Sequence, residues 1–330
     1  MLRIGVAGLG GMGSLHARNV LGLPGARLVA VASTRPERAE EAAAELGVRA
    51  STYGELFAAD DVDAVVVAAR SVDHAVRACE VLAAGKHLFL EKPGATSVAG
   101  QGAVREAAEA HPDRVVQVGY HRRYDRRWIE ARRRVTEGSI GRPLLVVGVA
   151  RDVRAPEPED PLPAGGFLMD MASHDYDAVC WFLGGKPVEV TALRQARVYP
   201  ELEALGDLDN ALVTIRFDDG GAAVTHVSRT CAFGHDVRCE IVGSEGSVFV
   251  GEAGGVLTAR DRSRFPQDYR ELFADAYREE LAAFAEACRG GERRGAGLAE
   301  DRVAVEIGIA ARASALTGEP RSVGVDWPWP

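Results

Sequence analysis

The chain has 330 residues, of which 47% are hydrophobic and 26% are charged, and its formal net charge is -9. This length and apolar content predict two globular domains or one large one. The acidic balance argues against a general affinity for nucleic acid or anionic membranes, because both favour a basic protein surface. The basic run Arg122–Arg134 is interpreted as the solvated face of a helix.

Neither a targeting segment nor a membrane span is indicated. Leu2–Ala7 is a short strand-like run that leads straight into glycines, and no apolar run approaches the ~20 residues of a span. A cytoplasmic location is therefore the expected default. The cysteines are odd in number and lack C-x-x-C spacing, so we expect reduced thiols and no metal site. They are Cys79, Cys180, Cys231, Cys239 and Cys288.

A glycine-rich turn follows the first strand-like run. Gly8–Gly13 reads G-x-G-x-x-G, and the helical run Ser14–Leu21 comes next. Glycines at this spacing permit a tight turn and let a pyrophosphate approach the helix N-terminus. A plain glycine turn is the alternative, but the flanking strand and helix favour a dinucleotide site. The cofactor residues expected here are Gly8, Gly10, Gly11, Met12 and Gly13.

The second strand-like run, Ala26–Ala32, ends at Ser33-Thr34. An NAD-binding unit usually has Asp or Glu at this point, about 20 residues past the glycines, to hold the ribose 2′-hydroxyl. Ser33 leaves room for a 2′-phosphate, which Arg35 or Arg38 could bind. We therefore predict that NADP(H) is favoured over NAD(H). The alternative is that both arginines are solvated and that either cofactor binds.

The N-terminal part of the chain continues to alternate between strand and helix patterns. The further strands are expected near Arg49 and over Ala64–Ala69, His87–Leu90 and Val115–Val118, and the helices over Glu37–Leu46, Tyr53–Ala58, His74–Ala84 and Ser97–Ala110. This alternation predicts an α/β Rossmann domain over residues 1–120, a doubly wound parallel sheet with ligands at the carboxyl ends of its strands. Lys92 follows such an end, which favours a site residue over a surface lysine. Ala69, His74 and Glu91 are also expected at the cofactor.

Residues 121–330 are predicted to form an α+β domain for substrate binding and oligomerisation, with a large open, mainly antiparallel sheet. Its strands are expected at Leu144–Val149, Val188–Gln195, Ala211–Phe217, Ala222–Ser228, Arg238–Val242 and Ser247–Val250, and its helices at Trp128–Glu137, Asp268–Arg289 and Ala299–Leu316. Apolar residues such as Val213, Ile215, Phe217 and Val224 suggest an open apolar sheet face. We therefore expect a dimer or tetramer through that face.

The stretch Gly165–Asp177 has helical spacing, and Asp170 and His174 are four residues apart, which places both side chains on one face. A carboxylate beside an imidazole can take and give a proton near neutrality. An ordinary structural hydrogen bond is the alternative for the isolated pair. The loop Arg151–Pro163, rich in proline and charge, leads into this stretch and is expected to line the cleft.

Taken together, these motifs resemble the Gfo/Idh/MocA oxidoreductase family, and within it the inositol 2-dehydrogenases. The resemblance covers nearly the whole chain and rests on Gly8–Gly13, Glu91–Pro93, Arg122–Asp125, Asp170–Asp175 and Phe233–Arg238, with Arg151-Asp152 and Ala155-Pro156 typical of the inositol subgroup. It implies that Lys92, Asp170 and His174 form the catalytic group. His174 would be the general base, Lys92 would stabilise the substrate oxygen, and Asp170 would support the imidazolium. Arg122, Asp152 and His235, together with the catalytic group, are expected to bind substrate.

Three positions depart from the family pattern. Ser33 replaces the acidic residue of the NAD-type enzymes, His235 stands where inositol dehydrogenases carry tyrosine, and Arg70 stands where proline is usual. The resemblance implies hydride transfer between the nicotinamide and a secondary alcohol of a cyclitol or sugar, with myo-inositol as the first choice. The alternatives are an NADPH-dependent reductase of a keto-sugar or amino-cyclitol precursor, or a non-catalytic sugar- or nucleotide-binding protein of the same fold.

Overall fold

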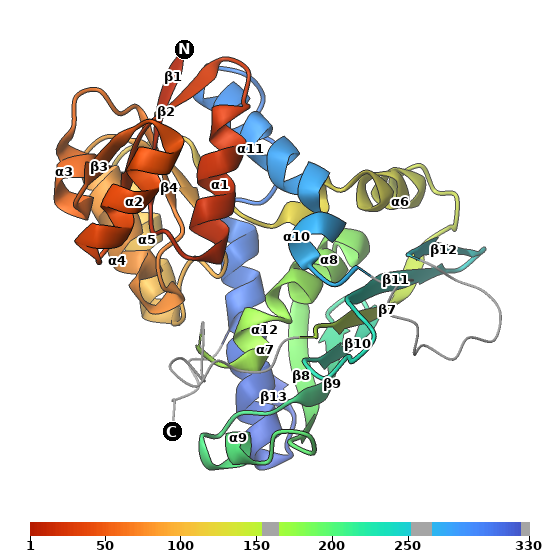
Figure 1. The fold of residues 1–330 in the computed structure, drawn as a ribbon. Coiled ribbons are helices and arrows are strands. Elements are labelled where there is room, and N and C mark those ends of the chain that lie inside the picture. The colour runs from red at the N-terminus through yellow and green to blue at the C-terminus, as the bar shows by residue number, and fades with distance from the viewer. Residues whose placement is uncertain (154–164, 252–265, 325–330) are drawn as a thin grey trace. The chain divides into compact units, whose positions relative to one another are not determined.

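The computed structural model describes residues 1–153, 165–251 and 266–324 (Figure 1). The chain divides into two compact units. The first comprises Met1–Tyr124 and Asp275–Arg302, and the second comprises Asp125–Ala274 and Val303–Pro330. The first break lies four residues from the predicted boundary at 120/121. The assignment of 275–302 to the first unit differs from the prediction, which placed the whole C-terminal part in the second domain.

The first unit contains a six-stranded parallel sheet in the order β3-β2-β1-β4-β5-β6. Its strands are β1 (Leu2–Ala7), β2 (Ala26–Ala32), β3 (Arg49–Ser51), β4 (Ala64–Val67), β5 (His87–Leu90) and β6 (Val116–Val118). The connecting helices are α1 (Gly11–Leu21), α2 (Pro36–Leu46), α3 (Tyr53–Ala58), α4 (His74–Ala83) and α5 (Val98–Glu109), with the 3-10 helices η1 (Ser71–Asp73) and η2 (His121–Tyr124). This strand order is that of the doubly wound dinucleotide fold, so the predicted Rossmann domain is confirmed.

Both faces of this sheet are buried. On β4, Val66 belongs to one core with α1 and α2, whereas Val65 and Val67 belong to a second core with α3 and α4. The first core also includes Leu281 and Phe284 of helix α11 (Ala274–Cys288). This apolar packing explains why residues 275–302 belong to the first unit.

The second unit contains a seven-stranded mixed sheet in the order β12-β11-β7-β10-β9-β8-β13, in which β7 and β10 pair in parallel and the other pairs are antiparallel. Its strands are β7 (Pro143–Arg151), β8 (Pro187–Gln195), β9 (Asn210–Phe217), β10 (Ala222–Ser228), β11 (Asp236–Gly243), β12 (Ser247–Val250) and β13 (Arg321–Ser322). The other helices are α6 (Arg126–Thr136), α7 (Phe167–Asp170), α8 (Ser173–Leu183), α9 (Glu201–Ala204), α10 (Tyr269–Leu272) and α12 (Leu298–Thr317), the last of which begins in the first unit. The predicted mainly antiparallel sheet is confirmed.

Three of the four apolar residues predicted for the open sheet face were wrong, whereas Val224 is half-buried on the side of β10 opposite the buried Ala223. Val213, Ile215 and Phe217 are each at most 1% exposed, because their side of β9 faces the core. Leu212 on the opposite side is 45% exposed, and Phe249 on β12 is 58% exposed. Alternation along a strand separates two faces but does not identify the inner one. Oligomerisation itself stays a prediction.

The helix predicted over Gly165–Asp177 is interrupted. Helix α7 ends at Asp170 and α8 begins at Ser173. The Ser173 hydroxyl donates to the Asp170 carbonyl at 3.1 Å, and so occupies the acceptor that a continuous helix would use for its next backbone bond. Asp170 and His174 therefore lie on either side of a helix break. Among the described residues, no helix is long and apolar enough to cross a membrane.

Candidate active site

The glycine turn between β1 and α1 fits a dinucleotide. Gly8 has a φ of +100°, and a Cβ there would lie 2.3 Å from the Ala68 carbonyl oxygen. A Cβ on Gly13 would lie 1.8 Å from the Gly8 carbonyl oxygen, so packing requires glycine at both positions. A Cβ on Gly10 or Gly11 would meet nothing within 4 Å. The N-terminus of α1 has no side-chain cap hydrogen bond, and the positive end of a helix favours an anionic group such as a pyrophosphate.

The end of β2 presents positive charge and no carboxylate. Ser33 is half-buried, and its hydroxyl accepts a hydrogen bond from the Arg35 backbone N–H at 3.2 Å. Thr34, Arg35 and Arg38 are exposed. These residues lie where the ribose end of a dinucleotide is expected from the fold.

The turn that carries Lys92 is held by buried groups. The Gly94 backbone N–H donates to Asp301 Oδ2 at 3.0 Å, and the Tyr120 hydroxyl donates to Oδ1 at 2.8 Å. Burial raises the pKa of Asp301 despite these donors and a third from Gln101. The fully buried carboxylate of Asp301, at the start of α12, thus fixes the segment after Lys92. Asp301 was not identified from the sequence.

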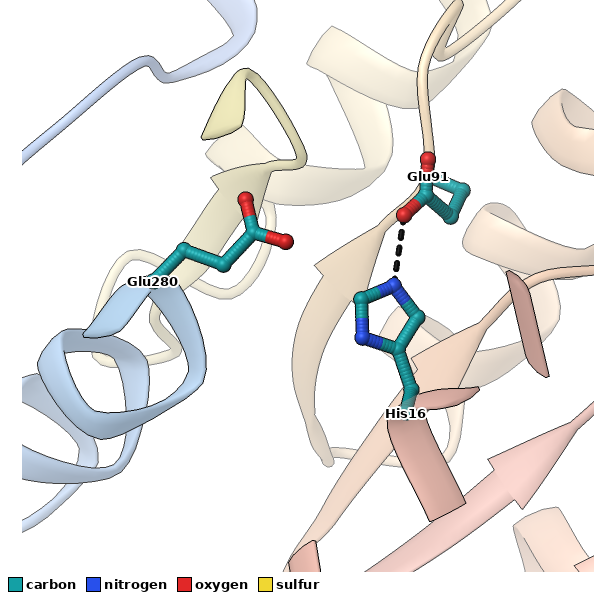
Figure 2. Close-up of side chains that lie close together, drawn as sticks. All are labelled: His16, Glu91 and Glu280. Atoms are coloured by element: carbon teal, nitrogen blue, oxygen red, sulfur yellow. Dashed lines mark hydrogen bonds and ion pairs between the residues drawn. The ribbon is translucent and has the colours of Figure 1, made fainter. Parts of the chain in front are cut away.

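Two of the residues predicted at the cofactor, His74 and Glu91, hold parts of the backbone. The ring nitrogens of buried His74 lie 2.8 Å from the Pro93 carbonyl oxygen and 3.1 Å from that of Ala69. Glu91 is also buried, and its carboxylate contacts the imidazole of His16 (Figure 2). The same carboxylate accepts a hydrogen bond from the backbone N–H of Lys92. These two residues shape the loops at the carboxyl ends of β4 and β5.

In the second unit, Asp170 and His174 are half-buried while their neighbours Met169 and Ser173 are buried. The segment before Asp170 is anchored at its backbone, because Phe167 N–H donates to Asp207 Oδ1 at 3.0 Å. Burial raises the pKa of Asp207. Asp170 and His174 therefore project from a buried segment whose backbone is anchored to Asp207.

The structure brings together two predicted substrate residues of the second unit. His235 Nδ1 lies 3.6 Å from Asp152 Oδ1. Arg229, which sequence reasoning missed, stacks on the Phe167 ring at 4.5 Å. Burial lowers the pKa of Arg229, although the negative charges of Asp207, Asp170 and Asp152 act to raise it. Arg229 is thus a buried cation that interacts electrostatically with Asp152 and Asp170. Its position directly after a strand was the only signal for it in the sequence.

The predicted catalytic residues fall in different units. Lys92 belongs to the first, as does the buried Arg122, whereas Asp170 and His174 belong to the second. Their assembly into one site is therefore part of the proposal below.

Comparison with known proteins agrees with this picture. Residues 2–120 match the oxidoreductase family with an NAD-binding Rossmann fold, and residues 128–249 match the GFO/IDH/MocA C-terminal domain. The chain is 35% identical to scyllo-inositol 2-dehydrogenase (NAD(+)) of Bacillus subtilis, over 98% of this chain and 97% of the relative. It is 34% identical to myo-inositol 2-dehydrogenase of Thermotoga maritima, over 98% and 99%. A solved structure of scyllo-inositol dehydrogenase from Lactobacillus casei, with bound NAD(H) and scyllo-inositol, superimposes with a TM-score of 0.89 at 25% identity, covering 98% of this chain and 100% of that one.

The fold and these matches define an oxidoreductase with an NAD-binding Rossmann domain. The chain belongs to the GFO/IDH/MocA family, as its motifs indicated.

Proposed function

We propose that this protein is a dehydrogenase that oxidises a secondary alcohol of a cyclitol to the ketone, with myo-inositol as the first substrate to test. One observation carries the proposal: a glycine cradle open at Gly10 and Gly11 occurs in one chain with the Asp170–His174 pair. The full-length similarity to inositol dehydrogenases supports the substrate class.

In this proposal His174 removes the hydroxyl proton of the substrate. Lys92 donates a hydrogen bond to the same oxygen and stabilises the negative charge that develops on it. Asp170 supports the imidazolium formed on His174. The nicotinamide, when bound, supplies the acceptor for the hydride that leaves the carbon. The residues of the two units act on one substrate only when both units contribute to one site.

We further propose that NADP(H) is favoured over NAD(H). The support is local, because Ser33 provides no carboxylate for a ribose 2′-hydroxyl and the exposed Arg35 and Arg38 can pair with a 2′-phosphate. The relatives whose names specify a cofactor use or bind NAD, so this chain would differ from them in preference.

Steady-state turnover over a panel of cyclitols and sugars, followed by the absorbance of reduced nicotinamide with each cofactor, tests the proposal. Oxidation of at least one cyclitol with higher kcat/KM than any sugar is the expected result. Turnover confined to sugars would reassign the substrate class. Saturable cyclitol binding without turnover in either direction would instead establish a binding protein.

A further inference from the structure

A buried cluster of three titratable side chains lies next to Lys92 in the chain and the fold. It consists of His16 from α1, Glu91 after β5 and Glu280 from α11, which are 0%, 5% and 0% exposed (Figure 2). One nitrogen or carboxylate oxygen from each side chain, of the kind that can bind a metal ion, lies within 4.8 Å of the other two. The dehydrogenase mechanism proposed above uses none of the three.

The geometry at the centre of this cluster is that of a hydrogen bond. His16 Nε2 lies 2.5 Å from Glu91 Oε1. Two protein atoms that ligate one zinc ion at about 2.0–2.2 Å each in a tetrahedral arrangement lie more than about 3 Å apart. A separation of 2.5 Å therefore indicates a direct hydrogen bond and leaves the pair unsuited to chelating a divalent ion as it stands.

The two carboxyl groups have opposite protonation preferences. Burial opposes ionisation of Glu91, but the hydrogen bond and charge of His16 outweigh it and lower the pKa of Glu91 below its ordinary value. Burial, and then the charge of Glu91, raise the pKa of Glu280 well above its ordinary value. Neither Glu280 oxygen has a hydrogen-bond partner among the residues that the structure describes. The surroundings therefore favour the charged form of Glu91 and the neutral form of Glu280.

Two neighbours of the cluster, His121 and Tyr277, add no carboxylate to it. His121 of η2 is fully buried, and burial, followed by the charges of Arg122 and Lys92, lowers its pKa well below the ordinary value. The Tyr277 ring of α11 contacts the rings of both His121 and His16. Within the cluster, His16 and the Glu91 carboxylate form a direct hydrogen bond.

Glu91 transmits this arrangement to the backbone of Lys92. While Oε1 accepts from His16, Oε2 accepts from the Lys92 backbone N–H at 3.1 Å. The Glu91 backbone N–H donates to the Val67 carbonyl of β4 at 2.9 Å. The carboxylate is therefore fixed at both oxygens, and Lys92 is tied to it directly.

We propose that His16 is a positioning residue for Lys92, because it orients the Glu91 carboxylate that holds the Lys92 backbone. This role deepens the dehydrogenase function proposed above and rests on it. In this proposal the cluster makes no contact with substrate and therefore has no catalytic function.

The composition of the chain permits a test that does not depend on turnover. Its three lysines are Lys86, Lys92 and Lys186. Acetylation by acetic anhydride, measured by mass spectrometry, gives a labelling ratio, which is the extent of modification of Lys92 relative to that of Lys86 and Lys186. His16→Ala is compared with Val20→Ala, a core truncation one turn further along the same buried face of α1.

We expect His16→Ala to change the Lys92 labelling ratio at least about threefold and Val20→Ala to leave it unchanged. Glu280→Gln, which replaces the acid by a neutral group of similar shape, should keep the wild-type ratio. In the turnover assay, His16→Ala should lower kcat about tenfold while the KM for the cofactor changes less than about threefold.

Equal shifts of the labelling ratio in His16→Ala and Val20→Ala would reduce the role of His16 to general stability and overturn the proposal. Failure of Glu280→Gln to fold, or a changed ratio in it, would overturn the protonated state of Glu280. A labelling result as expected, in a protein that oxidises no cyclitol, would leave the positioning role supported and refute the proposed substrate.

Discussion

His235 Nδ1 lies 3.6 Å from Asp152 Oδ1, and the backbone holds this carboxylate in place, because Asp152 N–H donates to the Ser228 carbonyl at 2.7 Å. A buried imidazole and a half-buried carboxylate thus form a preset pair in the second unit. In the proposed dehydrogenase, this pair selects the polyol.

Asp152→Asn should weaken substrate binding more than it slows chemistry. The change removes the charge that faces His235 and leaves an amide of the same shape. We expect the KM for the best cyclitol to rise about tenfold, equivalent to about 1.4 kcal/mol, with kcat within about threefold of wild type. Initial-rate kinetics at saturating cofactor measure both constants. A fall in kcat at unchanged KM would place Asp152 in the chemical step instead.

Replacement of the proposed base should remove most turnover. His174→Ala is expected to lower kcat by about 10² to 10⁴, because a positioned general base contributes about that much. His174 is half-buried in α8, so the variant should keep its fold and bind cofactor with wild-type affinity, as measured by fluorescence titration. A kcat within a few-fold of wild type would show that another group accepts the proton.

The features that could be predicted from the sequence depend on interactions between residues close together in the chain. The features that were missed depend on residues far apart in the chain. Gly8 and Gly13 were recognisable because part of their requirement is local: Gly8 has a φ of +100°, and a Cβ on Gly13 would meet the Gly8 carbonyl oxygen. The pair His16–Glu91 joins residues 75 apart in the chain, and neither residue carries a pattern that names the other. Helix α11 shows an amphipathic stripe, but the stripe does not specify which sheet it covers, so its packing on the Rossmann core required the structure.

Cofactor preference should follow the charge at the end of β2. Ser33→Asp supplies a carboxylate for a 2′-hydroxyl and repels a 2′-phosphate, so the kcat/KM ratio of NADP(H) to NAD(H) should fall at least ~10-fold. Arg35→Ala should lower the same ratio. Arg27→Ala, at an exposed position at the other end of β2, is the matched control and should leave it unchanged. A wild-type enzyme with a strong preference for NAD(H) would refute the prediction.

The stability of Glu280→Gln relative to wild type should depend on pH. Burial and the charge of Glu91 raise the pKa of Glu280 well above its ordinary value of 4.5, so the folded protein holds this proton more tightly than the unfolded chain does. The corresponding stabilisation is fully present below the ordinary pKa and is lost as the pH rises through the folded pKa.

The amide that Glu280→Gln introduces has no proton to lose over this pH range. The stability of the variant relative to wild type should therefore increase as the pH rises. We expect similar melting temperatures at about pH 5 and a higher melting temperature for the variant at about pH 9, by about 2–4 °C for each kcal/mol of difference. Differential scanning calorimetry at both pH values measures the gap, and comparison within each pH cancels the titration of all other groups. A gap that stays constant or narrows with rising pH would mean that Glu280 is ionised in the folded protein, and that the cluster holds two buried carboxylates beside His16.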